Sequence, residues 1–127
     1  MTKLPPWMRR ALFATAMMNL VVSAAFAPPA HAFRTMVGMP NDAHPLYLAT
    51  VGLFVLLFGL GYLWLALTGR PDRLFIALAA AGKIGFFSLL VWFAATGRLA
   101  LHLAAAGSAD LVFGALFVAW LATPVAR

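Results

Sequence analysis

Two fully charged residues, Lys83 and Asp110, stand near the middle of segments that are otherwise apolar. An ionisable side chain in membrane hydrocarbon costs about 2.5–3.5 kcal/mol on insertion scales, so such residues face a bundle interior, pair, or line a pathway. Neither segment offers another ionisable residue at mid-depth. Lys83 and Asp110 are therefore the first candidates for a functional site.

The composition indicates an integral membrane protein. Of the 127 residues, 65% are hydrophobic and 9% are charged, and the mean hydropathy is +0.97. Soluble domains average about 25% charged residues, so this chain has too few to cover a soluble surface. Cysteine is absent, which excludes disulfides and thiol chemistry. The net charge of +6 comes mainly from basic residues at segment ends, an arrangement typical of topology signals, so nucleic acid is not an expected partner.

Four apolar stretches approach or exceed the length of about 20 residues that a helix needs to cross a bilayer. They cover residues 11–27, 46–68, 74–95 and 99–122, within a single domain at 1–127. A connector at 28–45 separates the first two, and short turns join the others, which makes those neighbours antiparallel. The predicted fold is all-α: a four-helix transmembrane bundle, up-and-down and antiparallel.

The basic residues also predict an orientation. Six of them fall on one side of the bundle and two on the other, and the positive-inside rule places the richer side in the cytoplasm. The richer side carries Lys3, Arg9, Arg10, Arg70, Arg73 and Arg127, and the other side carries Arg34 and Arg98. Both termini are then cytoplasmic, the connector faces the exterior, and the expected location is a bacterial inner membrane.

Residues 1–32 admit two interpretations. Basic residues, an apolar core and a final A-x-A motif are also the features of a cleaved secretory signal. In favour of a retained helix, Thr15, Asn19 and Ser23 recur every four residues and would form one polar stripe facing neighbouring helices. Cleavage would leave three helices with the same C-terminal orientation.

Depth along the helices predicts that the two central charges meet. At about 1.5 Å per residue, Lys83 lies about 15 Å beyond Arg73, and Asp110 lies about 18 Å beyond Arg98 from the opposite surface. Alanine-rich and glycine-rich runs before both charges permit close backbone approach. The expected intramembrane polar cluster consists of Lys83, Asp110, Asn19, Ser108, Ser23 and Thr15. It either fixes helix register or exchanges a proton or binds a substrate head group.

The connector provides only weak candidates for metal ligands. His31, Met36, Met39 and His44 carry imidazole and thioether groups, which suit copper. Their density is low, and the methionines suit anchoring at a membrane surface equally well. A bis-histidine haem is not expected, because the other spans offer no partner for His102. We therefore predict no metal site and no cofactor.

Several short motifs give the chain a family resemblance. They are Val37-Gly38-Met39-Pro40, Arg70 to Arg73, Gly82-Lys83 and Asp110-Leu111-Val112-Phe113. This pattern resembles small bacterial four-helix integral membrane proteins of unknown function, broadly the DoxX-like group. The chain departs from it at Ser108-Ala109, where glycine is expected directly before the aspartate. The resemblance implies a retained first helix and no catalytic residue, and some DoxX-like proteins are associated with quinone-linked redox complexes.

The expected function is that of a non-enzymatic accessory or assembly subunit of a membrane complex, since no nucleophile, metal cluster or nucleotide motif is found in the sequence. Its expected partners are the lipid bilayer and a membrane protein or a second copy of itself. Two alternatives stay open. One is a small proton-coupled carrier or channel that uses Asp110 and Lys83, and the other is an accessory subunit of a quinone-linked oxidoreductase.

Overall fold

The computed structural model describes residues 3–124, and this part of the chain is helical without any strand. The long helices are α1 (Pro6–Ala25), α3 (Pro45–Thr68), α4 (Arg73–Ala95) and α6 (Ser108–Leu121). The short ones are η1 (Pro28–Ala30), α2 (His31–Val37) and α5 (Leu101–Ala106). Arg127, which contributed to the predicted orientation, lies outside the described residues.

Three helical stretches are long and apolar enough to cross a membrane. They are α3, α4, and α5 with α6 taken together from Leu101 to Leu121. The first segment passes the same test only when α1 is joined to η1 and α2, which turn away from it by 81°. The part of the chain described here therefore has three candidate spans, or four if the bent segment counts as one. This confirms the all-helical, membrane-compatible fold.

Local sequence explains where the helices begin and end. α1 starts at Pro6, five residues earlier than expected, because proline in the first turn lacks only an N–H that would be unpaired anyway. α3 begins with Pro45 and ends before Gly69, whose φ of 68° suits glycine. The carboxylate of Asp72 accepts a hydrogen bond from the Phe75 N–H at 2.9 Å and caps α4.

Two expected segments differ in detail from the structure. The connector at 28–45 contains the helices η1 and α2. The segment expected as one helix at 99–122 is divided at Gly107 into α5 and α6. A Cβ atom at Gly107 would clash with the side chain of Leu90, so glycine allows this junction to lie directly on α4.

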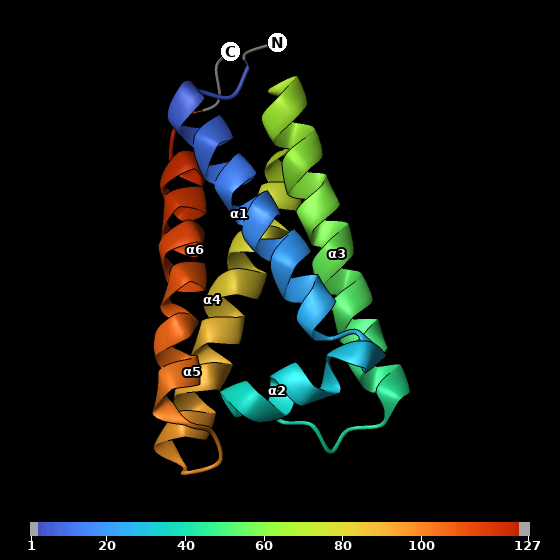
Figure 1. The fold of residues 1–127 in the computed structure, drawn as a ribbon. Helices are drawn as coiled ribbons and strands as arrows, with labels where there is room; N and C mark the ends of the chain where they lie inside the picture. The colour runs from blue at the N-terminus through green and yellow to red at the C-terminus, as the bar shows by residue number, and fades with distance from the viewer. Residues whose placement is uncertain (1–2, 125–127) are drawn as a thin grey trace.

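The bundle consists of two antiparallel helix pairs, α1 with α3 and α4 with α6 (Figure 1). Glycines bring the first pair together, because a Cβ at Gly59 would lie 3.0 Å from the Asn19 Cβ. The second pair approaches equally closely, since a Cβ at Gly114 would lie 2.7 Å from the Ile84 Cγ1. Although a short turn joins α3 to α4, these two helices diverge along their length, and α2 crosses the open end (Figure 1).

The hydrophobic core is concentrated toward the end where α1 begins and α6 ends. Its buried side chains come from all four long helices and from Leu4 just before α1: Leu4, Met8, Leu12, Ala16, Tyr62, Leu65, Ala66, Ile76, Ala79, Ala80, Phe117 and Trp120. Tyr62 is central among the aromatic rings. Its ring centroid lies 5.6 Å from that of Phe75 and 5.8 Å from that of Phe117. This core joins the two helix pairs next to the buried charges.

Candidate functional site: a buried lysine–aspartate pair

The two intramembrane charges form an ion pair between α4 and α6. Lys83 Nζ donates a hydrogen bond to Asp110 Oδ1 at 2.9 Å. The lysine side chain is 6% exposed and the aspartate side chain is 19% exposed. Between residues 3 and 124 this is the one ion pair that the structure contains. The prediction that the two charges meet is confirmed.

Two aromatic rings also lie close to the ammonium group. Lys83 Nζ lies 5.3 Å from the ring centroid of Tyr62 and 5.6 Å from that of Phe113. A cation over an aromatic face is attracted by the ring quadrupole, most strongly where water is excluded. Tyr62 belongs to α3, so the charge connects a third helix to the α4–α6 pair. The site is therefore a cation held by one carboxylate and two rings.

The break in the last span places the carboxylate where the backbone favours it. Asp110 lies in the first turn of α6, directly after the junction at Gly107. The first turn of a helix has unpaired N–H groups and partial positive charge, which stabilises a carboxylate there. Two groups thus compensate the charge of Asp110: the ammonium of Lys83 and the helix start.

The other residues of the predicted cluster have different surroundings. Asn19 Nδ2 donates to the Val55 carbonyl of α3 at 3.1 Å, and Ser23 Oγ donates to the Leu20 carbonyl within α1 at 2.8 Å. Asn19 therefore connects α1 to α3, and Ser23 bonds within α1. Their hydrogen bonds go to backbone carbonyls and not to Lys83 or Asp110.

Thr15 and Ser108 are the remaining residues of the predicted cluster, and they differ in burial. Thr15 is fully buried on the core face of α1, and its Oγ1 has no hydrogen-bond partner among the described residues. Ser108 is exposed at the start of α6. Neither forms a hydrogen bond with Lys83 or Asp110 within the range that the structure covers.

Residues of the connector have structural partners. His44 Nδ1 accepts a hydrogen bond from the Leu46 N–H at 3.1 Å and caps the start of α3. The carbonyl of His31 accepts from the Thr35 hydroxyl at 3.1 Å. Met36 is 76% exposed. In the described part of the chain, no three histidine, cysteine or acidic residues lie close enough together to hold a metal ion.

Arg34 was expected only as a topology signal, but it is one of the most buried side chains. It is 2% exposed, and its Nη1 donates to the carbonyls of Ala25 at 2.9 Å and Ala27 at 2.6 Å. Its Nε donates to Asn41 Oδ1 at 2.8 Å. The guanidinium thus binds the Ala25 carbonyl at the end of α1 and the Ala27 carbonyl, which also accepts from the Ala30 N–H, where the chain turns into α2.

Arg9 and Arg73 act in the same way at the opposite end of the bundle. Arg9 donates to the Ala66 and Leu67 carbonyls at 2.8 and 3.0 Å, near the end of α3. Arg73 donates to the Leu121 carbonyl at the end of α6, and its guanidinium also lies over the ring of Trp120. The C-terminal end of a helix carries partial negative charge, which these cations neutralise.

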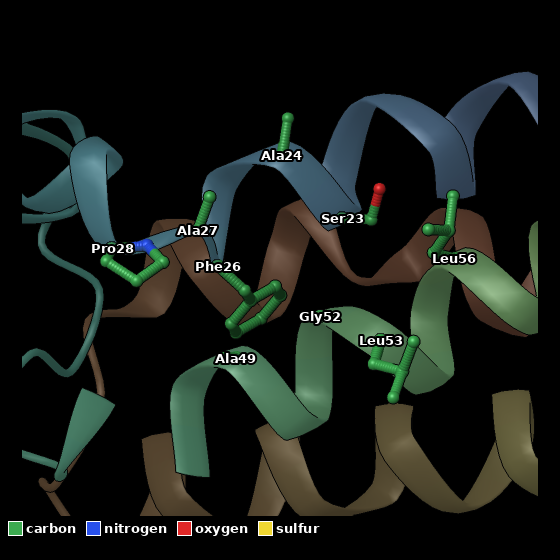
Figure 2. A pocket seen from close by; sticks show the side chains of 9 residues that line it. All are labelled: Ser23, Ala24, Phe26, Ala27, Pro28, Ala49, Gly52, Leu53 and Leu56. Atoms are coloured by element: carbon green, nitrogen blue, oxygen red, sulfur yellow. The ribbon is translucent and has the colours of Figure 1, made fainter. Parts of the chain in front are cut away.

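A shallow groove of about 260 Å³ lies between the end of α1 and the start of α3 (Figure 2). Its lining is apolar apart from one serine: Ser23, Ala24, Phe26, Ala27, Pro28, Ala49, Gly52, Leu53 and Leu56. The Phe26 side chain extends from α1 toward α3 in this view (Figure 2). Because neither Lys83 nor Asp110 lines it, the groove is separate from the ion pair.

Comparison of the chain with protein-family models, curated proteins and solved structures found no match. The fold and the site therefore define the class of the protein on their own. It is a small all-helical protein with three or four helices able to cross a membrane and a buried Lys83–Asp110 pair.

Proposed function

We propose that the protein is a non-enzymatic integral membrane protein that serves as an accessory or assembly subunit of a larger membrane complex. The observation that carries the proposal is the closed Lys83–Asp110 pair, whose ammonium is bound by the carboxylate and two aromatic rings. A buried pair of this kind stabilises the arrangement of helices in which the two charges meet. The rest of the long helices presents apolar surface to lipid and to partner helices.

The charge pair is suited to fixing the register of α4 against α6. Sliding one helix by a single turn would move the partners about 5.4 Å apart along the axis. Each charge would then be unpaired in a medium of low polarity, a change that costs about 3–5 kcal/mol when a buried pair is broken. A bundle locked in this way offers a partner an unchanging surface.

The proposed topology is up-and-down with both termini in the cytoplasm of a bacterium, and the DoxX-like resemblance agrees with a retained first helix. Its support is the uneven distribution of basic residues between the two ends of the bundle. Lys3, Arg9, Arg10, Arg70 and Arg73 belong to the end where α1 begins, and Arg34 and Arg98 belong to the end that α2 crosses (Figure 1).

Exchanging the two charges tests the structural role of the pair. We expect the double variant Lys83→Asp/Asp110→Lys to restore folding and assembly that each single variant loses, because the pair is rebuilt with its polarity reversed. Folding is read from monodispersity in detergent, and assembly from the size of the complex extracted from native membranes. Arg98→Asp, which alters one exposed charge, is the control.

A double variant that stays as unstable as the single variants would overturn the register-lock role, and one that folds but no longer assembles would favour a chemical role for the pair. A tagged protein that leaves the membrane only as an isolated monomer would overturn the accessory role. These results address separate parts of the proposal.

A second candidate, a proton-coupled carrier or channel, is favoured by the unequal exposure of the pair. The Asp110 side chain is 19% exposed against 6% for Lys83, so the carboxylate is the more accessible partner for a proton. In this case the purified protein should move protons into liposomes, and Asp110→Asn should abolish the flux while preserving the fold. A stoichiometric quinone in the purified protein would instead support the oxidoreductase alternative.

A further inference from the structure

At the end where α1 begins, the structure gathers basic side chains around Gly69. The Leu4 N–H donates to the Gly69 carbonyl at 2.9 Å, which holds the stretch containing Lys3 beside Arg70. The Arg9 guanidinium packs over the same glycine, 3.4 Å from the position of an added Cβ. The contact between Leu4 and Gly69, 65 residues apart in sequence, and the packing of Arg9 thus bring Lys3, Arg9 and Arg70 to one place, and Arg10 follows Arg9 on α1.

These cations differ in whether they are already bound. Arg9 is occupied by the carbonyls at the end of α3. Lys3, Arg10 and Arg70 are exposed, and no carboxylate of the described residues forms an ion pair with them. Asp72, the acidic residue nearest to them in sequence, uses one oxygen to cap α4. Three cations thus remain available to an anion.

Two tryptophans place this group of cations at the level of lipid headgroups. Trp7 and Trp64, on α1 and α3 at the same end, are 42% and 60% exposed. Trp64 precedes Gly69 by five residues, or about 7.5 Å along a helix. Indole rings settle at the membrane interface. Lys3 and Arg70, which lie beyond the tryptophans, and Arg10, one helical turn from Trp7, are therefore at the level of the phosphates. Below the tryptophans, Leu60 and Phe13 are about half exposed and offer an apolar surface for acyl chains.

We propose that Lys3, Arg10 and Arg70 form a binding site for the headgroup of an anionic phospholipid, whose chains lie along α1 and α3. The opposite end of the bundle lacks an equivalent site within the described residues, because Arg34 is buried and bonded and Arg98 is the one exposed lysine or arginine there. The proposal depends on the membrane location of the protein but not on its role as an accessory subunit.

Lipid competition on the wild-type protein tests the preference directly. The protein is placed in nanodiscs of phosphatidylcholine containing a minor fraction of phosphatidylglycerol, and the lipids that remain bound after release are counted by native mass spectrometry. Phosphatidylglycerol should be enriched over its bulk fraction, and the enrichment should fall as salt rises, since exposed charges are screened. Equal retention of both lipids would overturn the proposal.

Substitutions test whether the three basic residues cause the preference for phosphatidylglycerol. Each basic residue near an anionic surface contributes about fivefold to binding, so Lys3→Gln/Arg10→Gln/Arg70→Gln should lower the preference about a hundredfold. Arg98→Gln is the matched control and should leave it unchanged. The charge-preserving variant Arg10→Lys/Arg70→Lys, which keeps the topology signal, should retain the preference. If the lysine variant loses the preference for phosphatidylglycerol, or the triple glutamine variant keeps it, these three residues do not form the site.

A displacement experiment distinguishes a lipid headgroup from a soluble anion as the ligand. Inorganic phosphate and glycerophosphate, added at millimolar concentration, should displace little of the bound phosphatidylglycerol, because they lack the acyl chains that α1 and α3 bind. Full displacement by either compound would show a soluble-anion site and overturn the lipid assignment. The charge-exchange variant of Lys83 and Asp110 leaves this site intact, so failure here and failure of the proposed function are separable.

Discussion

The guanidinium of Arg34 lies 2.9 Å from the carbonyl oxygen of Ala25, the last residue of α1. The same side chain donates to Ala27 and to Asn41 and is almost completely buried. Directly after this point the chain turns by 81° into η1 and α2. One arginine therefore binds the open end of α1 and fixes the direction in which the connector leaves it.

Replacing Arg34 by glutamine should lower the free energy of unfolding by about 2–4 kcal/mol. A hydrogen bond to a charged group contributes about 1.5–3 kcal/mol. The Ala25 and Ala27 carbonyls would both lose the guanidinium, and only Ala27 keeps another donor, the Ala30 N–H. The measurement is an unfolding titration in detergent micelles. Arg98→Gln removes the same charge from an exposed site at the same end and should change stability by about 0.5 kcal/mol or less. Equal effects of the two substitutions would show that Arg34 does not hold the turn.

Removing one member of the ion pair should be more harmful than removing both. Lys83→Met leaves the carboxylate of Asp110 unpaired, and such a break in a buried pair costs about 3–5 kcal/mol. The double variant Lys83→Met/Asp110→Leu has no charge to bury and should regain most of that loss. A double-mutant cycle on unfolding free energies measures the coupling. Additive single effects would contradict the contact between the two side chains.

Adding one methyl group at Gly114 should separate α6 from α4. In Gly114→Ala the new Cβ would lie 2.7 Å from Ile84 Cγ1, so the helices must shift at a cost of about 1–3 kcal/mol. Gly85→Ala on α4 is the control, because a Cβ there meets no atom within 4 Å, and it should be neutral or stabilising. Adding Ile84→Ala to the Gly114 variant should relieve the overlap, and thermal unfolding should show a partial recovery.

The contact between His102 and Val37 should hold α2 against the last span. His102 Nε2 lies 2.7 Å from the Val37 carbonyl, which joins α5 to the end of α2. In His102→Leu, the Met39 amide, which donates to the Arg34 carbonyl, should exchange its hydrogen about fivefold faster, consistent with losing a hydrogen bond of about 1 kcal/mol. His31→Leu, at an exposed histidine of α2, serves as control. Unchanged exchange in His102→Leu would mean that the contact is not stabilising.

The ion pair could be predicted from sequence because the rise per residue of a helix is enough to give the depth of each charge in the membrane. Lys83 and Asp110 are isolated charges, and their distances from the ends of the spans match. The role of Tyr62 could not be found in this way, since α3 is apolar on every face and its sequence does not show which side is buried. A signal did exist, because a lysine side chain in a helix is directed toward the helix start, and the ammonium of Lys83 thereby approaches the level of Tyr62.

The arrangement around the connector could not be predicted, because it depends on contacts between distant residues. A seven-residue helix has little stability of its own, so α2 exists through the bonds of Arg34 and His102 to other elements. The divergence of α3 and α4 has a similar origin. The short turn between Gly69 and Asp72 sets the direction of the next helix, but the side chains that pack on each helix set the distance between them.

The proposed orientation predicts which ends of the helices a membrane-impermeant thiol reagent can reach. The chain has no cysteine, so a single introduced thiol reports its own position without background. Ala43→Cys lies in the exposed stretch between α2 and α3, and Ala122→Cys lies at the end of α6 on the opposite side of the bundle (Figure 1).

In cells whose outer membrane and wall have been removed but whose inner membrane is closed, a charged maleimide should label Ala43→Cys fully. Ala122→Cys should react only after the inner membrane is made permeable, because the positive-inside rule keeps that end in the cytoplasm. Labelling of both sites in permeabilised cells is the control for thiol reactivity. The reverse pattern would invert the orientation, and labelling of both sites in intact cells would mean that the last three helices do not alternate across the membrane.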